Sequence, residues 1–347
     1  MISKKSPLLK KKGAVTLKAV ADYVGLTAGT VSVVLNNSKS ASSIPEHTRA
    51  RIKEAARKLK YRPNFVARSL RVKRTFTVGV ITEEFGDAYG GGVLGGIETY
   101  LRENGYFLLA VAHRHDIKLQ HSYADLLTSR GVEGLITIDT SVDEPPLVPT
   151  VAVAGHKRVE NVTNIILDHR TAAKLALQHL KDLGHSRIAF LRGQFESSDS
   201  ITRWEALLEA AGELRIEIFP ELVLQIEGIN STPDLGYPYG KQLIERKVAF
   251  TALVAYNDIS AIGAMKAFRE ANLRIPHDIS IVGFDDISIA SFSIPPLTTI
   301  RQPLEEMGRI AAKTVVGLIE EQEEYVQEIA VEPRLIARGS TAPPRDL

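Results

Sequence analysis

The segment TLKAVADYVGLTAGTVSVVLN, residues 16–36, constrains the fold more than any other part of this chain. Four apolar residues recur with the i, i+3, i+4, i+7 spacing of one helical face: Leu17, Val20, Ala21 and Val24. Gly25 predicts the end of this helix, and the Thr27 hydroxyl is suited to cap a second helix. That second helix has a buried stripe of its own (Val31, Val34, Leu35) and an outward set of five residues: Ala28, Gly29, Thr30, Ser32 and Val33. The pattern predicts a helix-turn-helix, whose second helix enters the major groove of DNA; the alternative is an ordinary helical hairpin in a core.

Charge is distributed unevenly along the 347 residues. Residues 1–75 contain 18 Lys and Arg but only three acidic residues, which gives a formal charge of +15. Residues 76–347 contain 25 basic and 38 acidic residues, which gives −13. A cationic head of this kind favours binding to the phosphate backbone of nucleic acid. Within it, we expect residues 1–14 to form a basic disordered tail.

A third helix is predicted after Pro45, because Pro is tolerated in a first helical turn and an apolar stripe follows: Ile52, Ala55, Ala56 and Leu59. It completes a helix-turn-helix domain over residues 15–62. Residues 63–74 form a linker with helical potential, in which Asn64 is a good N-cap. Leu70 lies among arginines and is a candidate wedge for the minor groove, although the linker is equally readable as a plain tether.

The composition excludes several classes of protein. The chain has no cysteine, which excludes disulfides, thiolate metal sites and cysteine nucleophiles. It has neither an apolar run near the roughly 20 residues of a membrane span nor a secretory signal. We therefore expect a soluble, cytoplasmic protein with no membrane partner. No nucleophile and base are recognisable as a pair, so we do not expect an enzyme.

From Thr75 onward, β-rich runs alternate with helical stretches, which predicts parallel sheets covered by helices. We expect strands at 76–82, 106–112, 134–138, 187–192, 251–255 and 279–283. We expect helices at 170–183, 199–212, 235–246 and 258–271, together with two earlier helices that end near 104 and 130. One more helix and one more strand are expected within 298–330. Similar segments at 100–111 and 179–191 indicate two related α/β halves, with a cleft between them that closes on a small ligand.

Ligands bind beyond the carboxyl ends of such strands, and this rule selects the candidate ligand residues. Five side chains lie after predicted strands: Phe85, Tyr89, Arg203, Asn257 and Asp285. Carboxylate, amide and guanidinium groups bind hydroxyls, and aromatic rings stack on a sugar face. Asn257 is equally readable as a helix cap. Asp258 is expected to be a helix cap, and Asp286 to order its loop.

Two other motifs are weaker. Gly90, Gly92 and Gly95 match GxGxxG, but residues 83–89 separate them from the preceding strand, so a dinucleotide site is not favoured. His113 and His115, with His121 nearby, have no supporting carboxylate pattern and are read as loop histidines rather than metal ligands. We expect no metal and no cofactor.

Four motifs occur in an order and spacing that are highly specific: TLKAVADYVGLTAGTVSVVLNN, YRPNFVARSLR, GFDD followed by IPPLTTIRQP, and RGSTAPP. In these motifs the chain resembles transcription regulators of the lactose-repressor (LacI/GalR-type) family over nearly its whole length. The resemblance implies an all-α helix-turn-helix head joined by a hinge helix to an α/β two-lobed, periplasmic-binding-protein-like (type I) core at 75–347. Lobe 1 is expected at 75–167 and 300–331, and lobe 2 at 168–299 and 332–347, so that the chain crosses between the lobes three times.

The same resemblance implies a homodimeric transcriptional repressor that binds a pseudo-palindromic double-stranded DNA operator. It is controlled by a small-molecule effector, with a sugar as the main expectation and a purine-type corepressor as the alternative. It implies DNA contacts at Thr16, Thr27, Ala28, Gly29, Thr30, Ser32, Asn36, Asn64, Ala67, Arg68 and Leu70, with Ala28 and Gly29 at specificity positions. Arg203, Asn257 and Asp285 match effector-binding positions. The alternative from another class is a sugar-binding protein without DNA function. The cationic head argues against this alternative.

Overall fold

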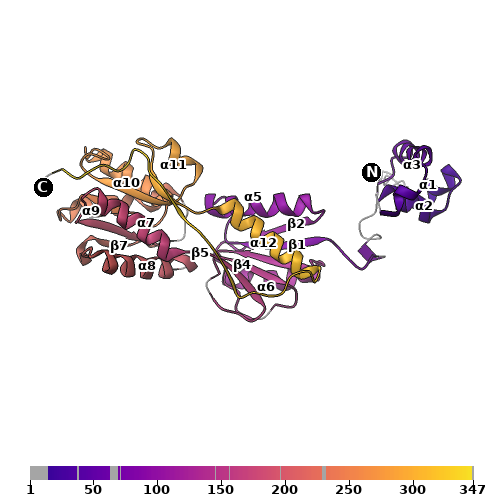
Figure 1. The fold of residues 1–347 in the computed structure, drawn as a ribbon, viewed down its shortest axis with the longest axis horizontal. Helices are drawn as coiled ribbons and strands as arrows, with labels where there is room; N and C mark the ends of the chain where they lie inside the picture. Colours follow the sequence, from indigo (N-terminus) through magenta and orange to yellow (C-terminus); the bar gives the residue numbers. More distant parts are fainter. Residues whose placement is uncertain are drawn as a thin grey trace, which may run out of the picture. The chain divides into compact units, whose positions relative to one another are not determined.

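The computed structural model describes residues 15–36, 39–62, 69–70, 72–144, 146–155, 157–195, 197–228 and 232–345. The chain divides into two compact units, Met1–Arg74 and Thr75–Leu347 (Figure 1). The predicted tail at 1–14 and most of the predicted hinge helix, including Asn64, Ala67 and Arg68, lie outside the described residues. Ser69 and Leu70 are described and are helical.

The first unit packs short helices around one small core. Its described helices are α1 (Leu17–Val24), α2 (Ala28–Leu35), the 3-10 helix η1 (Lys39–Ser43) and α3 (Glu46–Lys58). Each of the three α-helices contributes one completely buried side chain to this core: Val20, Val31 and Ile52. Helices α1 and α2 meet at 108°, which is typical of a helix-turn-helix. Within the described residues no single helix is long and apolar enough to cross a membrane, and this bent pair passes that test only by length and composition.

The turn between α1 and α2 is fixed by backbone chemistry. Gly25 has a φ of +66°, in the left-handed region that glycine adopts without strain, and the Leu26 amide donates to the Ala21 carbonyl at 3.0 Å. The Arg51 Nη2 donates to the Val24 carbonyl at 2.7 Å. Arg51 thereby links α3 to the C-terminal end of α1, so that α3 helps to fix the angle between α1 and α2.

The second unit contains two six-stranded sheets (Figure 1). The first has the order β11-β5-β4-β3-β1-β2, with β1 (Thr77–Thr82), β2 (Phe107–Ala112), β3 (Gly134–Ile138), β4 (Thr150–Val153), β5 (Val162–Leu167) and β11 (Glu328–Val331). The second has the order β12-β10-β9-β8-β6-β7, with β6 (Ile188–Arg192), β7 (Val223–Gln225), β8 (Ala252–Val254), β9 (Ser280–Asp285), β10 (Thr298–Arg301) and β12 (Arg334–Ile336). Neighbouring strands are parallel except β10 and β12.

Helices cover both sheets and define two lobes. The first lobe contains α5 (Ala88–Glu103), α6 (Ile117–Ser129) and α12 (Leu304–Ile319). The second contains α7 (His169–Asp182), α8 (Ser198–Leu214), η2 (Pro220–Leu222), η3 (Pro233–Leu235), α9 (Tyr237–Glu245), α10 (Asp258–Glu270) and α11 (Ser288–Phe292). The chain passes between the sheets after β5, after β10 and after β11.

One expected lobe boundary is wrong by two residues. Strand β10 pairs with β9 and β12, so Ile300 and Arg301 belong to the second lobe and the return to the first lobe begins at Gln302. Strands β4, β5, β7 and β12 have no counterpart in the sequence prediction. The segment 298–330, where one strand is expected, contains β10 and most of β11. Strand β2 is an edge strand with its side chains largely accessible, because only β1 pairs with it.

Two glycines, Gly96 on α5 and Gly308 on α12, allow these helices to pack closely. A Cβ atom at Gly96 would lie 2.0 Å from the Glu305 carbonyl oxygen, and one at Gly308 would lie 2.0 Å from the Val93 carbonyl oxygen. Helices α5 and α12 therefore touch backbone to backbone, which only glycine permits at these two positions. Of the glycines in the GxGxxG match, Gly92 would place a Cβ 3.0 Å from the Leu304 Cβ, whereas nothing lies within 4 Å of a Cβ at Gly95.

Candidate functional site

The N-terminal end of α2 presents small and polar groups on the surface of the head. The Thr27 Oγ1 accepts from the Thr30 amide at 3.2 Å and lies 2.9 Å from the Thr30 Oγ1. Ala28 and Gly29 are exposed. Thr16 caps α1 in the same way, accepting from the Ala19 amide at 3.2 Å. Exposed amides and hydroxyls at a helix N-terminus are suited to meet phosphates or base edges.

The expectation that Ser32 points outward is wrong. Ser32 is only 3% exposed, and the Asn36 Nδ2 donates to its carbonyl at 2.8 Å and to its Oγ at 3.0 Å. Ser32 and Asn36, both predicted to contact DNA, are therefore hydrogen-bonded to each other at the C-terminal end of α2. Val33, between them in sequence, is half-buried.

Residues 15–62 of the head also expose several basic side chains. The exposed ones in the described part of the head are Lys18, Arg51, Lys53, Arg57, Lys58, Lys60 and Arg62. Arg57 and Lys58 lie 2.8 and 4.0 Å from carboxylate oxygens of Glu54. Leu70 is 77% exposed, so its side chain is accessible to a partner.

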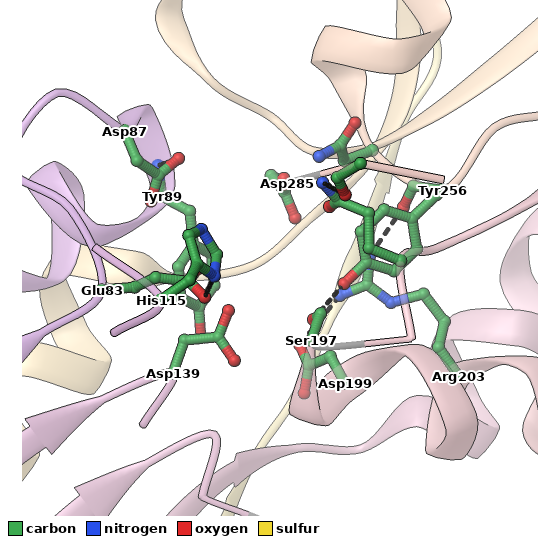
Figure 2. A pocket seen from close by; sticks show the side chains of 13 residues that line it. Glu83, Asp87, Tyr89, His115, Asp139, Ser197, Asp199, Arg203, Tyr256 and Asp285 are labelled. Atoms are coloured by element: carbon green, nitrogen blue, oxygen red, sulfur yellow. Dashed lines mark hydrogen bonds and ion pairs between the residues drawn. The ribbon is translucent and has the colours of Figure 1, made fainter. Parts of the chain in front are cut away.

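The second candidate site is a pocket lined from both lobes of the core (Figure 2). Its residues follow the carboxyl ends of β1, β2, β3, β6, β7, β8 and β9 or begin the next helix: Glu83, Asp87, Tyr89, His115, Asp139, Gln194, Ser197, Asp199, Arg203, Gly228, Tyr256, Asn257 and Asp285. Parallel strands bring these loops to one edge of each sheet, and the two edges face each other. Four of the five predicted effector residues lie here: Tyr89, Arg203, Asn257 and Asp285.

Phe85 is the exception among the five predicted effector residues. It is 53% exposed and does not line the pocket. Asp87, two residues later, caps α5 by accepting from the amides of Tyr89 and Gly90 at 3.1 and 2.6 Å. This cap turns the chain so that Tyr89 faces the pocket while Phe85 remains on the outer part of the loop. The Tyr89 hydroxyl is buried and has no hydrogen-bond partner.

Arg203 is held rigidly at the wall of the pocket. Its Nη2 donates to Asp199 Oδ2 at 2.9 Å and its Nη1 to the Tyr256 carbonyl at 2.6 Å. Its guanidinium carbon lies 3.8 Å from the ring centroid of Phe284 and 4.6 Å from that of Tyr256. Burial tends to lower its pKa, but the fields of Tyr256 and Asp199 outweigh this and raise it. Arg203 is thus a fixed cation.

Asn257 caps helix α10 and also lines the pocket. Its Oδ1 accepts from the Ser260 amide at 2.9 Å, and its own amide donates to the Ser260 Oγ at 3.1 Å, which forms a capping box at α10. The side-chain amide nitrogen stays available beside the pocket. The expectation that Asp258 caps this helix is wrong: Asp258 is fully buried and accepts from the Ile287 amide and the Thr299 hydroxyl at 2.9 and 2.6 Å.

Asp285 ends β9 and is 6% exposed. Its Oδ1 accepts from the Gln302 Nε2 at 2.7 Å, and burial raises its pKa well above the usual range. Asp286 orders the following loop, as its sequence position predicts, by accepting from Arg301 and Arg338, each at 2.6 Å. These pairs fix the strand end from which Asp285 faces the pocket (Figure 2).

Sequence reasoning missed most of the acidic residues of the pocket, including Glu83, Asp139 and Asp199. The strand-end rule applied to β3 would have found Asp139, which directly follows it. His115 was read as a loop histidine; its Nδ1 lies 2.7 Å from Glu83 Oε1 in the pocket. Among the described residues, no three potential metal ligands gather at one place.

Comparison with known proteins agrees with this two-part organisation. A family model for bacterial regulatory proteins of the lacI family matches residues 16–64, and one for a periplasmic binding protein-like domain matches residues 177–341. The chain is 32% identical over 337 residues to the HTH-type transcriptional repressor PurR of Haemophilus influenzae (94% of this chain, 98% of the relative). It is 31% identical to the PurR of Proteus mirabilis (94% and 97%).

Solved structures agree as well. The Lac repressor dimer bound to operator and the anti-inducer ONPF is similar with a TM-score of 0.82 at 28% identity, over 95% of this chain and 99% of that one. A LacI family regulator from Enterococcus faecium with bound ribose is similar with a TM-score of 0.68 at 27% identity, over 77% of this chain and 99% of that one.

Proposed function

Because the chain belongs to the lacI family of bacterial regulatory proteins and is a DNA-binding transcriptional repressor, we propose that it acts as a homodimer whose operator affinity is set by a small polar effector. The observation that carries this proposal is the pocket, which takes hydrogen-bonding side chains from both lobes of the core. A ligand that bridges two lobes favours the arrangement in which both contact it. Its binding energy is thereby available to move the lobes.

The head is proposed to read DNA with the N-terminal end of α2. Gly29 lets the backbone approach the duplex closely, and the Ala28 methyl group is suited to contact a thymine methyl. With so few side chains for base readout, much of the affinity comes from phosphate contacts by exposed Lys and Arg and from Leu70 as a minor-groove wedge. Two heads related by a two-fold axis favour a pseudo-palindromic operator. As a repressor that binds DNA, the protein is proposed to act at the nucleoid, in the cytoplasm.

A sugar is the effector that the pocket supports best. Asp139, Asp285 and the Asn257 amide are suited to bind hydroxyl groups, and the rings of Tyr89 and Tyr256 give apolar walls for a sugar face. Among similar structures, one regulator holds ribose and another is a complex with cellobiose. A purine-type corepressor is the second candidate, because the curated relatives carry the name PurR.

The core has exposed apolar side chains that are suited to form a dimer interface between two copies of the chain. Ile289, Phe292 and Ile294, on and just after α11, are 51%, 79% and 76% exposed. Large exposed apolar residues that lie close together mark interaction surfaces. A dimer that buries them would place the two cores on one two-fold axis, as two half-sites require.

The test is a thermal-shift screen of the full-length protein with hexoses, pentoses, hexose phosphates and purine bases. A selected operator duplex reports DNA affinity in the same samples. We expect one class to raise the melting temperature and to change operator affinity at least tenfold. Phe85→Ala, outside the pocket, should behave like wild type, whereas Asp285→Ala should lose the response. Absence of any shift across all classes would contradict an effector-controlled repressor.

A further inference from the structure

We infer that the first lobe has a second small-molecule site, which binds an uncharged ring compound with one hydroxyl group, such as phenol. The site is a groove beside α6, and among the described residues it shares no lining residue with the effector pocket. Three features of the groove support this assignment: its volume, one buried hydroxyl group without a partner, and the absence of charge from its floor.

The groove lies on the face of the first sheet opposite α5 and α12 (Figure 1). Strands β1, β3 and β4 form its floor, and residues 140–144, 146 and 147 form one wall. The other wall is α6, which contributes three residues spaced four apart on one helical face: Gln120, Ala124 and Thr128. The volume of about 460 Å³ lies within the roughly 300–1,000 Å³ that is typical of small-molecule sites.

Thr137 places a hydroxyl group at the floor of the groove. Side chains alternate between the two faces of a strand, and Ile136 and Ile138 belong to the core that contains α5 and α12. Thr137 therefore faces the groove, together with Leu135. Thr137 is 3% exposed, and its Oγ1 has no hydrogen-bond partner. A buried hydroxyl group without a partner carries a free-energy cost, which a ligand hydroxyl group bonded to it would remove.

The other threonines of the groove restrict the kind of polar group that a ligand can carry. Each of the three already donates its hydroxyl proton to a backbone carbonyl at 2.8 or 2.9 Å: Thr128, Thr140 and Thr150. Their oxygens can therefore only accept a hydrogen bond from a ligand, whereas Thr137 can both donate and accept. A ligand hydroxyl group suits this set, because it both donates and accepts as well.

The floor of the groove is uncharged. Ile81 and Leu135 give it an apolar surface on which a ring can lie. The titratable side chains of the described lining are all exposed to solvent: His121, Asp125, Asp143 and Glu144. A charged group of a ligand would lose its hydration at the floor and find no ion partner there. The groove therefore favours an uncharged ligand.

The groove and the effector pocket are joined by one loop. Asp139 lines the pocket, and the next residue, Thr140, lines the groove. Asp139 has a φ of +44°, so the backbone turns between the two sites. The Gln120 Nε2 donates to the Ser141 Oγ at 2.9 Å, which links α6 to the same loop. A ligand in the groove therefore lies against the loop that presents Asp139 to the effector.

The experiment measures the dissociation constants of phenol, toluene and benzoate for the full-length protein by ligand-observed NMR titration. The three compounds share a ring and differ in its substituent, and we expect phenol to bind at least fivefold more tightly than the other two. Thr137→Val keeps the shape of the side chain but removes the hydroxyl group. It should weaken phenol binding at least fivefold and change toluene binding less than twofold, whereas Ala124→Leu, which narrows the groove, should weaken both.

Thr163→Val is the matched control. Thr163 is also fully buried with an unpartnered Oγ1, but it lies outside the groove and pairs with Val151, which belongs to the core that contains α12. This variant should leave all three dissociation constants unchanged, and melting curves report whether each variant is folded. A crystal structure with phenol should place the ring against Leu135.

Three results would overturn the assignment: no binding of phenol, phenol binding that is unchanged in both groove variants, or benzoate binding as tight as that of phenol. Each of them would leave the effector-controlled repressor in place, because neither Thr137 nor Ala124 lines the effector pocket.

Discussion

At the residue scale, Gly29 stands out because the fold does not require it. Its φ lies outside the left-handed region, and an added Cβ would meet only the Thr27 Oγ1, at 3.7 Å. Glycine within a helix costs about 0.5–1 kcal/mol relative to alanine. The head therefore tolerates a stability cost at an exposed position on α2, which is reasonable where the backbone must approach DNA closely.

Gly29→Ala should accordingly stabilise the head and weaken operator binding. We expect the free energy of unfolding to rise by about 0.5–1 kcal/mol, because the variant loses less backbone entropy on folding. Denaturant titration and fluorescence anisotropy with operator DNA measure the two effects. Operator affinity equal to or above that of wild type would contradict a close backbone approach at this position.

Leu70→Ala tests the wedge. Because Leu70 is 77% exposed, its truncation should leave the melting temperature unchanged, while operator affinity falls at least tenfold through loss of the inserted side chain. Leu147→Ala, at an 86% exposed leucine of the core, is the matched control and should keep full affinity. Salt titrations of both variants separate the apolar loss from phosphate contacts, and an unchanged affinity for Leu70→Ala would reject the wedge.

Asp258 should make the core sensitive to pH. Burial is the main cause that raises its pKa to about 7 from the model-peptide value of 3.8, although the Thr299 hydroxyl and the Ile287 amide act against it. The folded state holds this proton more tightly than the unfolded state does. Its stabilising contribution is therefore full below about pH 4 and is lost as pH rises to about 7.

The measurement compares wild type with Asp258→Asn, which has no such proton. Between pH 5 and pH 7, wild type should lose about 2 kcal/mol more of its free energy of unfolding than the variant does. Denaturant titrations at both pH values give this difference. Parallel pH dependences of the two proteins would show that Asp258 titrates alike in the folded and unfolded states.

At the scale of elements, the contact between α5 and α12 holds the first lobe together. Gly96→Ala should lower the free energy of unfolding by about 1–3 kcal/mol, because its Cβ would collide with the Glu305 carbonyl and the helices would have to separate. Gly95→Ala is the matched control, since nothing lies within 4 Å of its Cβ. It should be neutral or stabilising, because alanine has the higher helix propensity. A similar loss in both variants would contradict the packing explanation.

The elements also show where sequence reasoning succeeds and fails. Helix α1 and strand β3 were predictable because periodic apolar residues and flanking glycines mark them. Strand length does not decide the outcome, because β8 has three residues and was predicted within 251–255, whereas β5 has six residues and was missed. The pocket rule located Asn257 and Asp285 through the strands before them, but Phe85 and Ser32 depend on the direction of a loop and on one side-chain pair, which no local pattern encodes.

At the scale of the whole molecule, assembly and DNA binding are expected to be linked. Phe292→Glu should convert the proposed dimer into a monomer, because a charge at a 79% exposed aromatic on α11 would be buried in the interface. Light scattering after gel filtration measures the mass, and anisotropy measures operator affinity, which should fall when two heads no longer bind together. Ile201→Glu, at an exposed site on α8, provides a comparison, and a Phe292→Glu protein that remained dimeric would place the interface elsewhere.

The three passages of the chain between the lobes have a consequence for synthesis on the ribosome. Strands β1 to β5 are made early, but α12 packs against β3, β4 and β5 and is made only after β6 to β10. Strand β11, the partner of β5, is made later still. The first lobe therefore starts to form before the second but is completed after most of it. During translation of the second lobe, the face of the first sheet that α12 covers remains exposed. In the growing chain, that face is where a chaperone would be expected to bind.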